Sequence, residues 1–314
     1  MNVLLTGASG FVGENLTRTI LKQNRFNLIS IHRKPPLIVD HPFKLISSIS
    51  ANNDWSSSLK NVDVVVHAAA KLPSIETVST DSLLDFRSVN VAGTLNLAKQ
   101  AAMNGVKRFV FLSSIKVNGE QTVLGHPFSA DDTPAPEDAY GISKWEAEQG
   151  LQQLAYETAM EVVIIRPPLV YGPGVKGNFA SLMKLVAIGL PLPLGAIHNQ
   201  RSLVALDNLL DLIITCIDHP AAANQVFLAG DGQDLSTTDL FREIARVMAK
   251  PSRLIPMPHS MLMFCSRLLG KSSVSNRLLG SLQVDISKAR DLLGWEPPIS
   301  VEEGLRRCIE YQEY

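Results

Sequence analysis

The sequence predicts an α/β fold in which a doubly wound parallel sheet is joined by a smaller mixed α/β lobe. Three observations predict it. Short β-branched runs without polar alternation recur through the first 170 residues, segments of helical period separate them, and the pattern changes beyond that point. Unalternating runs suit strands that are covered on both faces, and strand–helix–strand alternation favours a parallel sheet with right-handed crossovers.

The expected strands and helices of the first part follow one another along the chain. Strands are predicted at 3–5, 27–31, 62–66, 109–112 and 162–165. Helices are predicted at 11–23, at about 82–104 and at about 137–159. In the second helix, the apolar residues that fall on one face of α-helical period are Leu84, Val91, Leu95, Ala98 and Ala102.

The pattern changes beyond about residue 170, where proline and glycine become frequent and apolar runs shorten. Helical patterns remain near 206–217, 237–248 and 300–309, and turn-rich segments separate them. We therefore predict a first domain over residues 1–170 and a lobe over residues 171–314, some segments of which return to the first domain.

Composition argues against several classes of protein. The chain of 314 residues has 29 Lys and Arg against 30 Asp and Glu, a net charge of −1, whereas nucleic-acid binders carry a concentrated positive excess. Three cysteines lie far apart and suggest neither a disulfide framework nor a metal site. The sequence contains no signal-peptide pattern and no apolar stretch of about 18 residues. We expect a cytoplasmic enzyme without a nucleic-acid or membrane partner.

A glycine-rich turn, TGASGFVG at 6–13, follows the first predicted strand and opens the first helix. Glycines let a backbone turn tightly against a pyrophosphate, whose charge is stabilised by the free amides and positive dipole of the helix N-terminus. An ordinary glycine-rich turn is the alternative. The predicted dinucleotide contacts in this turn are Gly7, Ser9, Gly10, Phe11, Val12 and Gly13.

The second predicted strand ends without an acidic residue. Many NAD sites place a carboxylate about 20 residues beyond the glycine turn to bind the adenosine ribose, whereas a nearby arginine suits the 2′-phosphate of NADP. Here His32 stands at that place, and Arg33 and Lys34 follow it. Two solvated charges at the start of a loop are the alternative. The basic residues favour NADP(H) as the cofactor, with NAD(H) as the second choice.

A tyrosine and a lysine lie four residues apart in the third predicted helix. Tyr140 and Lys144 therefore share one helical face. A phenol can exchange the proton that accompanies hydride transfer at a carbonyl carbon, provided that its pKa falls from about 10 to near neutrality, which requires about 4 kcal/mol. A neighbouring lysine ammonium supplies attraction of the right sign.

Other polar residues occur where a ligand would lie. Ser113 and Ser114 end the fourth predicted strand, at the edge where parallel sheets bind ligands. We expect Ser114 to bind a substrate oxygen; a turn cap is the alternative. Asn90 interrupts an apolar helical face and is expected either to hold a water or backbone carbonyl near the lysine or to be a satisfied core side chain.

Together the motifs resemble the extended short-chain dehydrogenase/reductases, most closely the nucleotide-sugar epimerases and 4-ketoreductases of the UDP-glucose 4-epimerase type. The resemblance rests on the glycine turn, HAAA at 67–70, NVAGT at 90–94, the serine pair and YGISK at 140–144, in family order. It implies a Rossmann domain for NAD(P) over 1–170 and a substrate lobe over 171–314. It also implies a catalytic triad and further cofactor contacts. The triad is Ser114, Tyr140 and Lys144, and the cofactor contacts are Ala68, Ala69, Ala70, Asn90, Ser113, Tyr140, Lys144 and Pro167.

The resemblance also implies a nucleotide-diphosphate sugar as substrate and a homodimer formed through the helices at 82–104 and 137–159. Besides Ser114, the implied substrate contacts are Asn178, Arg201 and Arg277. A surface position is the alternative for each of them.

Three functions follow from these features. An epimerase oxidises and re-reduces the same sugar carbon and keeps its NAD, whereas a 4-ketoreductase consumes NADPH. Because His32 and Arg33 replace the acidic residue, we expect reduction of a UDP-4-keto-6-deoxy-hexose or hexosamine for surface polysaccharide synthesis. The alternative is an NAD-dependent UDP-hexose 4-epimerase. A catalytically idle cofactor sensor is less favoured, because a sensor needs only the glycine turn.

Overall fold

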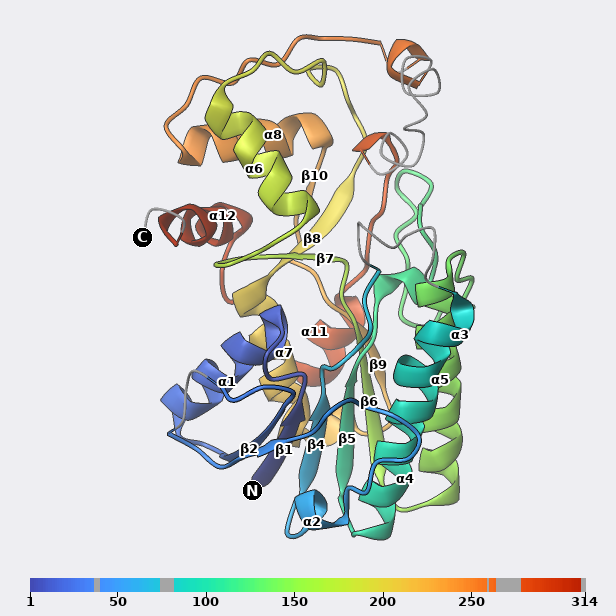
Figure 1. The fold of residues 1–314 in the computed structure, drawn as a ribbon. Coiled ribbons are helices and arrows are strands. Elements are labelled where there is room, and N and C mark those ends of the chain that lie inside the picture. The colour runs from blue at the N-terminus through green and yellow to red at the C-terminus, as the bar shows by residue number, and fades with distance from the viewer. Residues whose placement is uncertain (37–39, 74–81, 259, 264–277, 312–314) are drawn as a thin grey trace.

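The computed structural model describes residues 1–314 apart from 37–39, 74–81, 259, 264–277 and 312–314 (Figure 1). A large sheet and a smaller sheet, each with its helices, make up the fold. Across the described residues, no helix is long and apolar enough to cross a membrane.

The large sheet has seven strands in the order β3-β2-β1-β4-β5-β6-β9, and every neighbouring pair is parallel. Its central strands are almost wholly buried, as expected of a sheet covered on both faces. The five predicted strands are confirmed. The strands are β1 (Asn2–Thr6), β2 (Asn27–His32), β3 (Phe43–Leu45), β4 (Val64–His67), β5 (Arg108–Leu112), β6 (Glu161–Arg166) and β9 (Val226–Leu228).

Helices cover both faces of this sheet (Figure 1). On one face α1 (Phe11–Gln23) and α7 (Leu206–Asp218) share an apolar core with the strands. On the other face α4 (Thr94–Met103) and α5 (Ala139–Glu157) do the same, with the short α2 (Ser56–Leu59) beside α4. The predicted doubly wound architecture is therefore confirmed.

The helix predicted at 82–104 is interrupted by a π-helical segment. It consists of α3 (Leu83–Phe86), the π-helix η1 (Arg87–Gly93) and α4. A π-turn contains more residues than an α-turn, so the buried face rotates along the chain. Leu84, which the α-helical pattern placed on the apolar face, is 73 % exposed, and Asn90 is buried instead. The prediction of one continuous α-helical face was wrong for this reason.

The smaller lobe is built on a three-stranded mixed sheet in the order β10-β8-β7 and lies above the large sheet in Figure 1. Strands β7 (Leu169–Tyr171) and β8 (Arg201–Ala205) are parallel, and β10 (Asp234–Leu235) is antiparallel to β8. Helices α6 (Asn178–Ile188), α8 (Thr237–Val247) and α12 (Val301–Glu310) pack on its apolar core. The helices predicted near 206–217, 237–248 and 300–309 are all present as α7, α8 and α12.

Segments from beyond residue 170 return to the large sheet. Helix α7 packs against α1, β9 pairs with β6, and α11 (Ser287–Leu293) packs near β9. Short helical turns η2 (Ile115–Val117) and η3 (Pro220–Ala222) complete the large lobe. The division of the chain at residue 170 stays a prediction.

Candidate active site

The carboxyl ends of four neighbouring strands, β1, β4, β5 and β6, meet at one edge of the large sheet. In the parallel register Thr6 pairs with His67 and Leu112 pairs with Ile165, so the strands end at similar heights. Open parallel sheets bind their ligands at this edge. The structure therefore brings together the predicted site residues that follow these strands: Gly7, Ala68, Ala69, Ala70, Ser113, Ser114 and Pro167.

The glycine turn between β1 and α1 is packed so closely that side chains would not fit. Gly7 has φ +75°, and a Cβ there would lie 2.6 Å from the backbone of Ala68 and Ala69. A Cβ on Gly13 would lie 2.1 Å from the carbonyl oxygen of Gly7. Gly10 caps α1 without a side-chain hydrogen bond, and its own amide donates to Gly7 O at 2.9 Å.

This turn leaves the amides at the start of α1 for an anion. The first-turn amides, which include those of Phe11, Val12 and Gly13, have no acceptor within the helix. Ser9 is exposed beside them, and the helix dipole favours negative charge at this end. The turn therefore fits a dinucleotide pyrophosphate.

The end of β2 holds a hydroxyl-bridged pair of histidines. Ser30 Oγ lies 2.7 Å from His32 Nε2 and 2.7 Å from His41 Nε2, and both imidazoles are buried. Burial, and then the neighbouring His41, lower the pKa of His32; burial also lowers that of His41, against the charge of Asp40. His32 is therefore neutral at pH 7, while Arg33 and Lys34 beyond it are exposed.

Tyr140 and Lys144 lie on the buried face of α5, one helical turn apart, as the sequence predicts. Lys144 Nζ donates to the carbonyl oxygen of Leu112 at 2.8 Å and lies 4.3 Å from the centre of the Phe111 ring. Burial lowers the pKa of Lys144 to about 7, although the Glu148 carboxylate acts in the opposite direction. Burial, and then the charge of Asp138, raise the pKa of the Tyr140 phenol.

A buried histidine links the ends of β1 and β4 with α4. His67 Nδ1 lies 2.6 Å from Thr6 Oγ1, and its Nε2 lies 3.0 Å from Thr94 Oγ1. The ring stacks on Phe111 with centroids 5.9 Å apart. Burial, and then the charge of Lys144, lower the pKa of His67 to about 3, so the imidazole is neutral.

Ser114 and Asn90 both make hydrogen bonds that hold the surrounding backbone. Ser114 caps η2, and its Oγ accepts from Lys116 N at 3.3 Å; a hydroxyl that accepts in this way keeps its hydrogen for a second partner. Asn90 Oδ1 accepts from Lys71 N at 2.8 Å, while its Nδ2 donates to Lys71 O and to Ser143 Oγ at 3.0 Å. Asn90 thus joins the segment after 68–70 to α5.

Two further predicted substrate residues, Asn178 and Arg201, belong to elements of the smaller lobe. Asn178 is the first residue of α6, whose cap Gly177 makes no side-chain hydrogen bond. Arg201 begins β8, and its Nη1 donates to the carbonyl oxygen of Gly280 at 2.9 Å. Arg277 lies outside the described residues. Within the described part of the chain, no group of histidine, cysteine, aspartate or glutamate could hold a metal ion.

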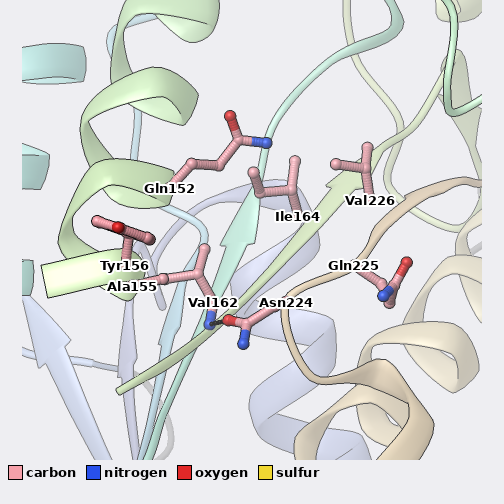
Figure 2. Close-up of a pocket in the computed structure, with 8 residues that line it drawn as sticks. All are labelled: Gln152, Ala155, Tyr156, Val162, Ile164, Asn224, Gln225 and Val226. Atoms are coloured by element: carbon pink, nitrogen blue, oxygen red, sulfur yellow. Dashed lines mark hydrogen bonds between the residues drawn. The ribbon is translucent and has the colours of Figure 1, made fainter. Parts of the chain in front are cut away.

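A cavity of about 440 Å³ lies elsewhere, between α5 and strands β6 and β9 (Figure 2). Val162 and Val226 in its wall belong to the amino-terminal parts of their strands, and Asn224 Oδ1 accepts from Val162 N at 2.9 Å. The cavity therefore lies away from the carboxyl edge of the sheet, and none of the predicted site residues lines it.

Comparison with known families decides how this site is to be understood. The family model described as the NAD dependent epimerase/dehydratase family matches residues 3–230. The chain belongs to that family. Its fold, its glycine turn and the tyrosine–lysine pair of α5 agree with the resemblance to the extended short-chain dehydrogenase/reductases, which is confirmed, and the protein is an enzyme of this epimerase type.

Individual proteins are similar to this one over almost the whole chain. A UDP-glucose 4-epimerase from Vibrio cholerae is 50 % identical over 310 residues, which cover 98 % of this chain and 94 % of the relative. The solved UDP-glucose 4-epimerase from Thermotoga maritima with UDP-glucose has a TM-score of 0.80 at 24 % identity, covering 100 % and 99 % of the two chains. MoeE5 in complex with UDP-glucose and NAD has a TM-score of 0.78 at 23 % identity, with the same coverage.

Sequence reasoning missed three buried polar side chains of the site. His67 was noticed only as part of HAAA; its position at the end of an apolar strand was the available signal. Glu148 lies one helical turn beyond Lys144, and Arg166 ends an apolar strand just before Pro167. A charged residue at such places in a buried element is a signal, because charges are almost never fully buried unless they are paired.

Proposed function

We propose that this chain is a UDP-hexose 4-epimerase that works with retained NAD. One observation carries the proposal: Tyr140 and Lys144 share the buried face of α5, and Lys144 is hydrogen-bonded to the end of β5 directly before Ser113 and Ser114. The 50 % identity to a UDP-glucose 4-epimerase supports epimerisation better than the ketoreduction that the sequence analysis favoured.

The residues of the glycine turn and of the strand ends would hold the NAD. Gly7, Gly10 and Gly13, with the amides and side chains of Ser9, Phe11 and Val12, would bind the pyrophosphate. Residues 68–70, Asn90, Ser113 and Pro167 would line the nicotinamide end, where Lys144 would bind the ribose. When bound, NAD supplies reversible hydride acceptance at C4 of the sugar. At the adenosine end, His32, Arg33 and Lys34 would lie near the ribose.

The chain's own residues transfer the proton and orient the sugar oxygen. As the C4–H bond breaks, Tyr140 takes the proton of the 4-hydroxyl and a 4-keto sugar forms. After the keto sugar rotates in the site, C4 is reduced on its other face and Tyr140 returns the proton to the C4 oxygen. Ser114 donates a hydrogen bond to the C4 oxygen and so orients it. The ammonium of Lys144 stabilises the tyrosinate, which burial and Asp138 disfavour.

The sugar diphosphate would lie toward the smaller lobe. The open start of α6 offers first-turn amides next to Asn178, and a helix N-terminus attracts phosphate. Arg201 and Arg277 would add positive charge, although Arg201 also holds the carbonyl of Gly280. These three contacts are part of the proposal.

The second candidate is a 4-ketoreductase that uses NADP(H). The observation in its favour is the end of β2, where neutral His32 provides no carboxylate and the exposed Arg33 and Lys34 suit a 2′-phosphate. A catalytically idle sensor is disfavoured because the tyrosine, lysine and serine of the triad are all retained.

The homodimer and the cytoplasmic location stay predictions. Large apolar side chains on the helices expected to form the dimer support the first of these. Leu84, Met103 and Tyr156 are 73 %, 83 % and 89 % exposed.

The test incubates the purified protein with UDP-glucose, without added cofactor, and follows the C4 epimer by NMR. We expect conversion to the epimer, loss of turnover in Tyr140→Phe with NAD binding retained, and normal turnover in Tyr156→Phe, an exposed position on the same helix. If no epimer forms, while a UDP-4-keto-sugar causes stoichiometric NADPH oxidation, the protein is the reductase and the proposal is wrong.

A further inference from the structure

A buried ion pair lies on the same buried face of α5 as Tyr140 and Lys144, one helical turn beyond Lys144. Arg166, the last residue of β6, donates from Nε to Glu148 Oε1 at 3.0 Å and from Nη2 to Oε2 at 2.5 Å. The side chains are 3 % and 0 % exposed, so among the ion pairs of the described residues this is the one with both partners almost fully buried. Burying two charges is costly, and replacing such a pair by apolar residues is often neutral or stabilising. Stability alone therefore explains this pair poorly.

The carboxylate of the pair holds the strand end that leads to the catalytic serine. Ser113 Oγ donates to Glu148, one helical turn beyond Lys144, which itself binds Leu112 O. Two consecutive residues of the β5 end are thus held by two consecutive turns of α5. The backbone of the same segment is also tied to β6, because Ser113 N donates to Ile165 O at 2.8 Å.

The guanidinium holds the far end of the turn that begins at Ser114. Arg166 Nη1 donates to Asn118 Oδ1 at 2.9 Å, and Asn118 Nδ2 donates to Ser129 O at 2.9 Å. Ser114 is the N-cap of η2, and Asn118 is its C-cap. The ion pair therefore holds both ends of the turn: Glu148 binds Ser113, the residue before Ser114, and Arg166 binds Asn118, the C-cap.

The acid of the pair lies one helical turn from Lys144, and its base neutralises it there. The Glu148 carboxylate raises the pKa of Lys144 against the effect of burial. Of the other titratable groups, the neutral His67 of β4 lies close to Lys144, and Asp138, the N-cap of α5, acts on Tyr140. Asp138 is itself paired with Lys116, which also pairs with Glu120. Removing either member of the ion pair leaves an uncompensated buried charge at the end of β5 that Lys144 binds.

We propose that Glu148 and Arg166 are positioning residues for proton transfer at Tyr140, because they fix the turn of Ser114 against α5 and neutralise each other beside Lys144. The inference rests on the proposed function only in assigning proton transfer to Tyr140. It predicts that the two single charge deletions act in opposite directions, which a purely structural pair would not do.

The test is a near-ultraviolet titration of the Tyr140 phenolate in the NAD-loaded protein, with Tyr140→Phe subtracted. In Glu148→Gln the remaining Arg166 charge favours the phenolate, so the apparent pKa falls by about one pH unit. In Arg166→Gln the remaining carboxylate raises it by about one pH unit. The double variant returns to the wild-type value. Glu146→Gln is the matched control, since Glu146 lies on the same helix and pairs with Arg87 at a partly exposed site.

Glu148→Asp tests the positional half of the proposal and serves also if a single charge deletion fails to fold. It keeps the charge but shortens the reach to Ser113, so we expect an unchanged phenolate titration, a kcat about tenfold lower and an unchanged KM for the sugar. Shifts of equal sign in both charge deletions, or wild-type kcat in Glu148→Asp, would overturn the proposal. The titration uses no sugar, so opposite shifts without conversion of UDP-hexoses would refute the proposed function and leave this inference standing.

Discussion

Replacing His67 by glutamine should remove a pH-dependent part of the protein's stability. The imidazole is 1 % exposed, lies between Thr6 and Thr94, and has a pKa lowered to about 3 from an ordinary 6.5. The unfolded chain therefore binds a proton below pH 6.5 that the folded protein does not accept until about pH 3. The contribution of the neutral His67 to the free energy of unfolding is fully present above pH 6.5 and decreases as the pH falls below that value.

The size of this effect follows from the two pKa values. pH 5 lies about 1.5 units below the pKa of the histidine in the unfolded chain, and each unit is worth 1.36 kcal/mol. The free energy of unfolding is therefore about 2 kcal/mol lower at pH 5 than at pH 7.5. His67→Gln lacks this titration, although it is less stable at pH 7.5 because its hydrogen bonds to the threonines are poorer.

Urea denaturation at pH 7.5 and pH 5 measures the difference. We expect the wild type to lose about 2 kcal/mol more than His67→Gln over this interval. His126→Gln, at an exposed position, is the matched control and should follow the wild type. Equal losses in the wild type and His67→Gln would show that His67 is not the buried neutral group described above.

Two further predictions concern the glycine turn and the start of α5. Gly13→Ala places a methyl group on the carbonyl of Gly7, so we expect loss of NAD binding by calorimetry and about 2 kcal/mol of destabilisation, whereas Gly10→Ala, whose Cβ would lie 3.2 Å from the same oxygen, should weaken binding less. If both variants bind NAD equally, the close packing is not what the turn requires. Asp138 Oδ1 accepts from Gly141 N at 2.7 Å and so caps α5. Urea unfolding should show a free energy of unfolding about 1 kcal/mol lower in Asp138→Ala, whereas Asp138→Asn should retain the capping contribution. Equal midpoints would contradict the capping role.

The first half of the fold was predictable because its signals are local. Predominantly apolar runs of three to five residues and an amphipathic segment at 11–23 suffice to place β1, β2, β4, β5, β6 and α1. The π-helix was not predictable, because the spacing of apolar residues in this part of the sequence still fits an α-helix. The strands β7, β9 and β10 were not predicted, because two or three residues carry no distinct periodicity, and β8 was not predicted either.

The candidate site was predictable where a residue's chemistry is visible in its spacing. Tyr140 and Lys144 could be predicted from their separation of one helical turn, and the glycines from their position after a strand. The partners of Glu148 could not be predicted, since Arg166 and Ser113 come from two different strands. His32 shows the opposite case: its position was clear, but its burial against Ser30 depends on His41, which the sequence does not connect with it.

The place of β9 in the large sheet has a consequence for synthesis of the chain. β6 receives its second neighbour only from β9, which leaves the ribosome after β7, α6, β8 and α7. Until then, the edge of β6 presents unpaired amides and carbonyls that could pair with another nascent chain. The apolar core on the α1 face of the sheet is likewise incomplete until α7 has been synthesised. The nucleotide-binding half therefore completes its folding only after much of the smaller lobe has been made, and a premature stop near residue 170 would leave an aggregation-prone fragment.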